Sequence, residues 1–257
     1  MISRRGFVGS AAAAGFLAAC AGAKRKVSGA TAPDGTVSSG ATLVTTEPAT
    51  TTTAVQGPAT FVAHGPSTST GVALTFHTAG DPAITEQILA DAARLGAKLT
   101  FFLVGNWAQG NPNTLKQIID GGHELGNHTW SHIDMPRLSA AGMLTEITKC
   151  ADVLSAQTGT ISKYFRASQT DVPSAAILEQ AGKAGYAKSV GYDVDPLDYT
   201  NPGASLVVSR TRAHLHPGAF VSLHTLYRGT ATALPQIIAA VRGRGLEPVT
   251  VSTVLGS

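Results

Sequence analysis

The chain has 257 residues, 43% hydrophobic and 14% charged, a balance that indicates a large buried core and excludes an intrinsically disordered chain. The first 57 residues hold five of the 19 basic side chains and two of the 16 acidic ones, so they account for the whole net charge of +3. Residues 58–257 carry 14 basic and 14 acidic side chains, and this balance excludes nucleic acid as a partner.

Residues 1–20 are predicted to form an export signal. Arg4 and Arg5 precede an apolar run that is too short for a stable membrane-spanning anchor. The paired arginines indicate the twin-arginine route, and LAAC at 17–20 resembles a bacterial lipoprotein cleavage box with Cys20 as the lipidated residue. A plain signal peptide cut nearby is the alternative. We therefore expect an exported lipoprotein, anchored through Cys20 on the outer side of the cytoplasmic membrane.

Residues 21–57 are rich in Thr, Ser, Ala, Gly and Pro. Such a segment has too little apolar surface to offset its ordering entropy, so it is predicted to be a flexible tether. Fully extended, it would reach roughly 120 Å, which is enough to lift a domain off a membrane and into the wall layer. The folded domain is expected to occupy residues 58–257.

Strand-like apolar runs alternate with helix-period segments through this domain. The expected strands are 72–76, 98–104, 123–128, 163–166, 187–192, 219–224 and 247–251. The expected helices are 82–95, 111–122, 139–157, 173–185, 203–215 and 231–243, with Ser139 as an N-cap and Cys150 as a small buried residue. About seven alternations predict an α/β fold with a parallel sheet, either open or closed into a barrel.

Polar residues follow the strands at the points where the strands end. In parallel α/β folds the carboxyl ends of the strands meet at one face, where active sites are built. The residues concerned are His77, His128, Arg166, Asp195, Asp198 and His224. We therefore expect these side chains to converge on one site.

Two histidines four residues apart, His128 and His132, lie in GNHTWSH at 126–132. Imidazole nitrogens at this spacing can bind one metal ion. A hydrogen-bonded core pair is the alternative, because the spacing alone is a weak signal.

The sequence GGHELGNHTWSH (121–132) resembles the second motif of the polysaccharide deacetylase family, which are metal-dependent carbohydrate esterases. YDVDPLDYT (192–200) resembles the fourth motif, with Tyr199 where the family often has Trp, and GAFVSLHT (218–225) resembles the last. The similarity covers residues 58–254. It implies a distorted, incomplete parallel (β/α) barrel of about seven strands.

The resemblance also implies roles for single residues. His128 and His132 become metal ligands, and His224 becomes the general acid that protonates the leaving amine. Asp198 would orient His224 and favour its charged form.

Three further residues are assigned to substrate binding. Tyr199 and Leu223 are expected to wall the acetyl pocket, and Trp130 is assigned to the same surface. The substrate would lie in a groove across the strand ends.

The first motif departs from the family pattern. The family reads TFDDG, in which the first Asp is the base and the second binds the metal, whereas this chain reads TFHTAGD at 75–81. His77 stands in the place of the base, and positive charges nearby should lower its pKa and keep it able to accept a proton. Asp81 is the first choice for the third metal ligand, with His77 as base. The alternative is that His77 itself completes a three-histidine site, in which case the metal-bound water ionises without a dedicated base or Asp81 serves as base.

The third motif also departs, because prolines and an aromatic residue usually follow its arginine. Here the sequence is FRASQ at 165–169, in which Arg166 is retained and neither the prolines nor the aromatic residue follow it. Arg166 is counted with His77, His224 and Asp198 among the catalytic residues.

Together these residues predict a metal-dependent hydrolase that removes N-acetyl groups from a cell-wall or envelope polysaccharide. Zinc is the expected ion, with cobalt or another divalent ion as alternatives, and the protein is expected to act as a monomer. The substrate would be a polymer of the N-acetylglucosamine or N-acetylmuramic type. One alternative is a catalytically inactive, glycan-binding lipoprotein with a deacetylase fold. Another is a related hydrolase acting on a different amide or on an ester.

Overall fold

A computed structural model describes residues 57–257 of the chain. The predicted export signal, the lipidation site Cys20 and all but the last residue of the predicted tether lie outside the described residues. Within residues 57–257, no helix combines the length and the apolar character needed to cross a membrane.

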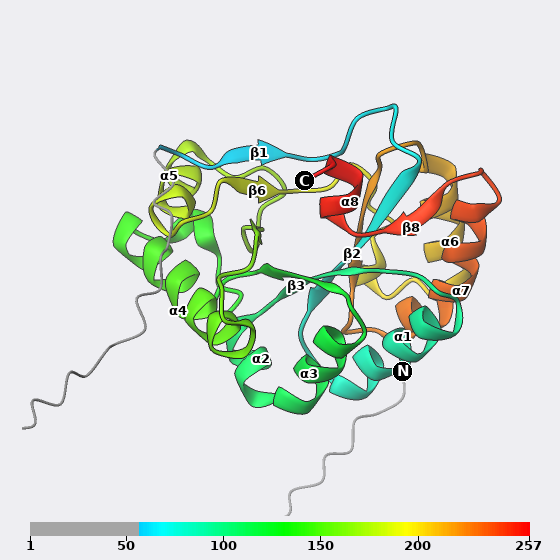
Figure 1. Ribbon diagram of the computed structural model, residues 1–257, viewed down its shortest axis with the longest axis horizontal. Helices are drawn as coiled ribbons and strands as arrows, with labels where there is room; N and C mark the ends of the chain where they lie inside the picture. Colours follow the sequence, from blue (N-terminus) through cyan, green and yellow to red (C-terminus); the bar gives the residue numbers. More distant parts are fainter. Residues whose placement is uncertain (1–56) are drawn as a thin grey trace, which may run out of the picture. The chain divides into compact units, whose positions relative to one another are not determined.

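The strands of residues 57–257 form a single parallel sheet that curls into an open, distorted half-barrel (Figure 1). Seven strands follow one another in the order β1-β6-β5-β4-β3-β2-β7, and β8 pairs with the start of β2. The strands are β1 Thr60–Val62, β2 Gly71–Thr78, β3 Thr100–Leu103, β4 Glu124–Asn127, β5 Tyr164–Phe165, β6 Lys188–Val190, β7 Phe220–His224 and β8 Glu247–Val249. The predicted incomplete barrel of about seven strands is confirmed.

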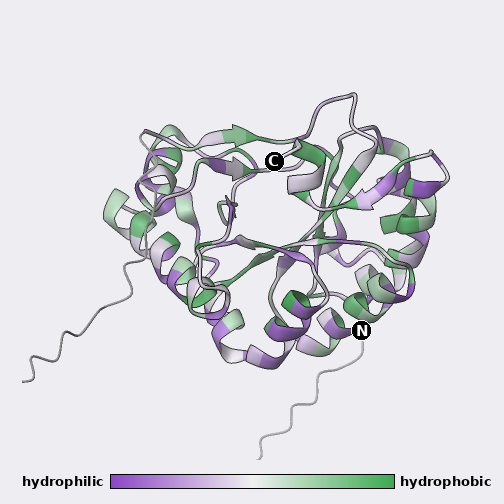
Figure 2. Ribbon diagram, viewed as in Figure 1, coloured by the Kyte–Doolittle hydropathy of each residue, from purple (hydrophilic) through white to green (hydrophobic). Residues whose placement is uncertain are grey.

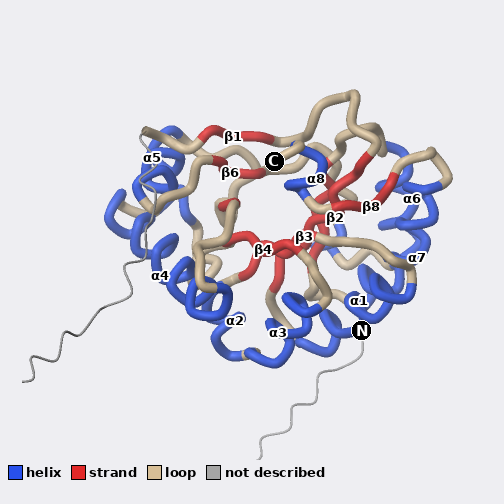
Figure 3. The backbone as a smooth tube through the Cα atoms, viewed as in Figure 1, coloured by secondary structure: helices blue, strands red, loops and turns tan. Residues whose placement is uncertain are grey.

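All helices but the last wrap around the outside of this sheet as an arc (Figures 1 and 3). They are α1 Pro82–Arg94, α2 Gly105–Gly110, α3 Pro112–Asp120, α4 Ala140–Thr158, α5 Ala175–Lys183, α6 Ala204–His214 and α7 Arg228–Arg242. The last helix, α8 Val251–Leu255, lies on the inner side of the sheet, where Val251 and Val254 pack with Ala73. In Figure 2 the helices of the arc carry both hydrophobic and hydrophilic residues, as expected for helices with one face on the sheet and one in solvent.

The longer predicted helices are all present, and the predicted N-cap is confirmed because the Ser139 hydroxyl accepts the Gly142 N–H of α4. Three short elements were not predicted: β1, α2 and α8. Each has six residues or fewer, which is too short for a periodic pattern to show. The last predicted strand ends early because Thr250 caps α8.

The central strand β2 is buried along its whole length because it is covered on both faces. Val72, Leu74 and Phe76 point outward into the main core beneath the helices. The alternate residues point inward, where Ala73 joins a second apolar cluster. His77 follows Ala73 on this inner side at the strand's carboxyl end.

Cys150 of α4 is free and fully buried, as expected for a small core residue. Burial raises the pKa of its thiol to about 12, so it stays protonated and inert.

Candidate metal centre

The inner faces of β2 and β7 bring the first set of polar side chains together. Thr75 and His77 alternate along β2, Ser222 and His224 alternate along β7, and the strand register places His77 beside His224. The two imidazole rings stack with centroids 4.4 Å apart and planes 17° from parallel. The sheet thus carries the two histidines as neighbours from strands 147 positions apart in the sequence.

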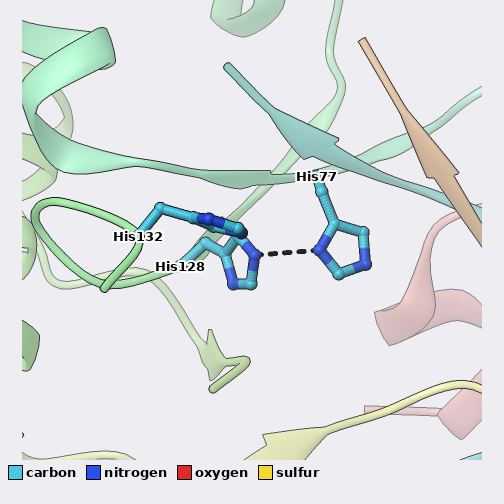
Figure 4. Close-up of side chains that lie close together, drawn as sticks. All are labelled: His77, His128 and His132. Carbon is cyan, nitrogen blue, oxygen red and sulfur yellow. Dashed lines mark hydrogen bonds between the residues drawn. The ribbon is translucent and has the colours of Figure 1, made fainter. Parts of the chain in front are cut away.

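Three histidines converge at this end of the sheet (Figure 4). His77 comes from β2, His128 directly follows β4, and His132 lies in the loop after it. One ring nitrogen from each lies within 4.8 Å of the other two. His77 and His128 are buried, and His132 is half-buried.

This donor set fits a metal ion. Three neutral imidazoles with an open side suit zinc and related divalent ions. Nδ1 of His77 lies 2.8 Å from Nε2 of His128, which is a hydrogen bond. Neighbouring nitrogens on a tetrahedral zinc ion with bonds of 2.0–2.1 Å are about 3.3 Å apart. The two rings would therefore separate by about half an ångström to admit the ion, and the shared proton would leave.

Asp81, the first choice for the third ligand, has a different role in the structure. It is the N-cap of α1, where its Oδ1 accepts the Ala83 N–H at 3.0 Å. Its other oxygen lies 3.7 Å from the Arg228 guanidinium, and half of the side chain is exposed. The physical reason is the Pro82 that follows it, because Asp–Pro is a strong helix-start signal. The geometry favours His77, the alternative third ligand.

Arg166 is buried next to His77, and its hydrogen-bond partners in the described part of the chain are all uncharged. Its guanidinium donates to the carbonyls of Val190 and Gly191, to the Thr75 hydroxyl at 2.9 Å and toward Nε2 of His77 at 3.2 Å. Burial lowers the pKa of Arg166 to about 9, so it remains charged near pH 7.

The histidines of the cluster are held in the neutral form. Burial, with the positive charges around the ring, lowers the pKa of His77 well below its ordinary value of 6.5. The same causes lower the pKa of His128, and burial together with His224 lowers that of His132. The direction for His77 agrees with the sequence-based expectation, and neutral imidazoles are the form that a metal ion needs.

His224 and Asp198, the predicted acid and its partner, are in contact. Nδ1 of His224 lies 2.7 Å from Oδ1 of the fully buried Asp198. The other oxygen of Asp198 accepts the backbone N–H of His224 at 2.8 Å and the Thr230 hydroxyl at 2.7 Å. Since Nδ1–H donates to the carboxylate, Nε2 of His224 is left to act on a ligand.

A cleft of about 540 Å³ opens over these groups. Its lining includes His77, His132, Gln169, Asp171, Tyr192, Asp195, Tyr199, His224 and Leu226. Tyr199, which was predicted to wall the acetyl pocket, lines this cleft with its ring 5.8 Å from that of His224. Burial raises the pKa of Asp195, whose carboxylate faces the same space.

Two residues assigned to substrate binding do not line this cleft. Leu223 is on the outward face of β7 and is fully buried in the main core, because it alternates with the inward His224. Trp130 packs against Gly105 of α2, and the Lys149 amine of α4 lies 4.5 Å over its ring.

Two polar contacts at the histidines were not predicted. The Ser222 hydroxyl lies 3.1 Å from Nε2 of His77, and the Gln169 amide lies 3.1 Å from Nδ1 of His132. Because alternate residues of a strand point to the same face, the sequence could have placed Ser222 on the same face of β7 as His224. No local pattern could have placed Gln169, which lies in a loop with left-handed backbone.

Comparison with known proteins gives one consistent result. The family model for polysaccharide deacetylases matches residues 64–189. A Bradyrhizobium chitooligosaccharide deacetylase is 30% identical over 191 residues, which cover 68% of this chain and 86% of that protein. The peptidoglycan-N-acetylmuramic acid deacetylase of Bacillus subtilis is 31% identical over 181 residues, or 70% of this chain and 38% of that protein. This chain therefore spans well under half the length of the Bacillus relative.

Solved structures give the same fold. A CE4 family pseudoenzyme from Bacillus anthracis matches with a TM-score of 0.69 and 25% identity over 76% of this chain and 68% of that one. A mutant of that protein with restored enzymatic activity matches with a TM-score of 0.71 and 25% identity over 76% and 70% of the two chains.

Proposed function

The chain belongs to the polysaccharide deacetylase family, and from this premise we propose that it is a metal-dependent hydrolase that removes N-acetyl groups from a cell-wall or envelope polysaccharide. The observation that carries the proposal is the convergence of two groups of side chains on one cleft. The three-histidine cluster supplies a metal site, and the His224–Asp198 pair supplies an acid.

His77, His128 and His132 would hold the ion, with zinc as the preferred candidate for three imidazoles. The chemistry that such an ion supplies is that of a Lewis acid, which polarises a carbonyl and lowers the pKa of the attacking water. With His77 as a ligand, its Nδ1 lone pair is committed to the ion. We therefore assign no separate base among the predicted residues, since Asp81 is engaged at α1.

His224 would supply the proton that the leaving group needs. In amide hydrolysis, water oxygen adds to the acetyl carbon and the C–N bond breaks, giving acetate and a free amine. The amine nitrogen leaves readily only if it is protonated. Asp198 accepts Nδ1–H of His224 and stabilises the imidazolium, so that Nε2 can hold and deliver that proton.

The cleft would bind an N-acetylated sugar of the N-acetylglucosamine or N-acetylmuramic type. Tyr199, half-exposed beside His224, offers an aromatic face on which a sugar ring or acetyl group can pack. The names of the bacterial relatives, which act on peptidoglycan or chitooligosaccharides, support this class of substrate.

A glycan-binding protein without catalysis is the second candidate. It is favoured by the loss of both carboxylates of the first motif, since His77 and Thr78 replace them and the buried Arg166 has no carboxylate partner within residues 57–257. The similar fold of a CE4 pseudoenzyme supports this candidate too.

We also propose that the protein is exported as a monomeric lipoprotein. Arg4, Arg5 and the LAAC sequence ending at Cys20 support this location. Incorporation of labelled fatty acid into the wild type but not into Cys20→Ala would support it, and equal labelling would contradict it.

The two candidate functions separate in one assay. Purified protein, stripped and reloaded with zinc, cobalt or no metal, is incubated with N-acetylated chitooligosaccharides and peptidoglycan fragments. Acetate release that needs both metal and His128, tested with His128→Ala, supports the hydrolase. Glycan binding without acetate under every metal condition, unchanged in His224→Ala, supports the binding protein.

A further inference from the structure

We propose that Gln169 and Ser222 are positioning residues of the three-histidine site. Gln169 fixes the orientation and tautomer of His132, and Ser222 accepts the outer N–H of His77 once the inner nitrogen of that ring gives its lone pair to the ion. The inference rests on the proposed metal site and adds to it the side chains that make three histidines act as ligands.

A neutral imidazole has one N–H and one lone pair, and a metal ion takes the lone pair. The second nitrogen must then donate its proton to an acceptor, which fixes the ring and raises its basicity as a ligand. His128 already meets this requirement. Its Nδ1 lies 2.9 Å from the Arg166 carbonyl, which can only accept, so Nε2 holds the lone pair.

Gln169 can do the same for His132. The nitrogen of its side-chain amide lies 3.1 Å from Nδ1 of His132. Rotating the amide by 180° exchanges its nitrogen and oxygen, so the oxygen can occupy that position and accept Nδ1–H. Nε2 of His132 is then left with its lone pair for the cluster.

The two loops that carry these residues are tied together. The Thr129 hydroxyl donates to the Ser168 hydroxyl at 3.1 Å, and Ser168 donates to the Ile133 carbonyl at 2.6 Å. The backbone N–H of His132 also donates to Thr129. Thr129 and Ser168 are fully buried.

Both facing residues have strained backbones. His132 and Gln169 each have φ of 57°, a left-handed conformation that is unfavourable for residues other than glycine. Such strain persists only where the surroundings impose it, and here it places the amide opposite the imidazole.

Ser222 is the corresponding partner of His77. Two groups lie within hydrogen-bond distance of Nε2 of His77: the Ser222 hydroxyl at 3.1 Å and the Arg166 guanidinium at 3.2 Å. Arg166 can only donate, whereas a hydroxyl can donate or accept. When Nδ1 of His77 gives its lone pair to a metal ion, Nε2 carries the proton, and Ser222 is the partner able to accept it.

The two departures from the family motifs therefore meet at one place. His77 alters the first motif and Gln169 the third, and each lies against the same cluster. As a metal ligand, His77 needs an acceptor for the N–H of its other ring nitrogen, and Ser222 can provide it. Gln169 can provide the same acceptor for His132.

The test compares zinc affinity in matched variants, by competition with a chromophoric chelator. Gln169→Leu and Ser222→Ala remove the acceptors, and each should weaken zinc binding by about 10- to 100-fold. Gln169→Glu keeps an acceptor and should bind at least as tightly as the wild type. Gln157→Leu, the same chemical change at an exposed position of α4, should bind like the wild type.

A second readout reports the tautomer directly. Long-range ¹H–¹⁵N NMR of the metal-free wild type should show the His132 proton on Nδ1, and Gln169→Leu should lose that preference. A merely structural role of Gln169 would not move this signal. Because Gln169 is exposed, its variants should fold normally.

The outcomes are distinct. If the wild type binds zinc and both Gln169→Leu and Ser222→Ala bind it equally well, the inference is overturned and the metal site stands. If the wild type binds zinc no better than His128→Ala, the metal site and this inference both fail.

Discussion

The two sides of the cleft differ in how completely they are built. On the β7 side, the Asp198 carboxylate is fully buried and receives three hydrogen bonds, two of them from His224. On the β2 side, the buried Arg166 has only uncharged partners among the described residues, and the motif that usually supplies two carboxylates supplies His77 and Thr78. We call His224 with Asp198 the acid half of the cleft, and the three histidines with Arg166 the metal half. The acid half has kept its carboxylate, whereas neutral groups have replaced the carboxylates of the metal half.

This difference has an electrostatic consequence. A divalent ion bound by three neutral imidazoles beside a guanidinium gains no carboxylate charge from its ligands. Its affinity should depend strongly on the orientation of the rings and on keeping them unprotonated. The orientation of His224 should be far less sensitive to such changes, because the buried Asp198 carboxylate accepts both its ring N–H and its backbone N–H.

The largest expected effect is on the acid half. His224→Ala should lower the rate of acetate release by about 10²- to 10⁴-fold, the usual contribution of a general acid, with bound zinc unchanged. The rate and the zinc content are measured on the same preparation. An unchanged rate would remove His224 from the mechanism, and lost zinc would show that the two halves are not separable.

The next effect is that of pH on stability. His77 and His128 have folded-state pKa values well below the ordinary 6.5, so the unfolded chain binds more protons as pH falls through that value. The stability that these two neutral histidines allow is complete above pH 6.5. Below that pH the free energy of unfolding falls, by up to about 2.7 kcal/mol per pH unit for the two together.

Urea unfolding of the metal-free protein at pH 7.5 and at several values below 6.5 measures this slope. His77→Asn should remove one titrating group and lower the slope by up to about 1.4 kcal/mol per pH unit. A slope that is the same in both proteins would show that His77 is not held neutral by the fold.

A smaller effect should follow from returning a carboxylate to the metal half. His77→Asp would give Arg166 a charged partner, and a hydrogen bond to a charged group contributes about 1.5–3 kcal/mol. The variant should therefore be more stable than His77→Asn, the uncharged match, in urea unfolding at pH 7.5. Equal stability would mean that Arg166 is already fully satisfied by its neutral partners.

The smallest effect is expected at Asp81. Asp81→Ala should cost about 1 kcal/mol of stability through loss of the α1 cap. Asp81→Asn should restore most of that stability, because asparagine also caps helices. Thermal unfolding of the pair measures the difference, and a similar loss in both variants would contradict the capping role.

The sequence predicted best where function depends on local motifs at strand ends. His128, His132, His224 and Asp198 follow or flank buried strands, and the sheet brings them to one edge. The acid pair could be read from two motifs because each member lies in its own recognisable motif, His224 at the end of the buried strand β7 and Asp198 in the segment 192–200.

Other assignments failed although the sequence contained the needed signal. The Asp–Pro step at 81–82 marks a helix start, which gives Asp81 a capping role. Successive side chains of a strand point to opposite faces, so Leu223 must point outward if its neighbour His224 points inward. The contact between Gln169 and His132 lay beyond such reasoning, since it depends on left-handed backbone in two loops.

The most direct test of a rebuilt metal half is zinc bound per chain in three proteins: the wild type, His77→Ala and Asp81→Ala. We expect about one zinc ion in the wild type and in Asp81→Ala, and an affinity at least about tenfold weaker in His77→Ala. Loss of zinc in Asp81→Ala with full binding in His77→Ala would contradict the three-histidine site and return the third ligand to Asp81.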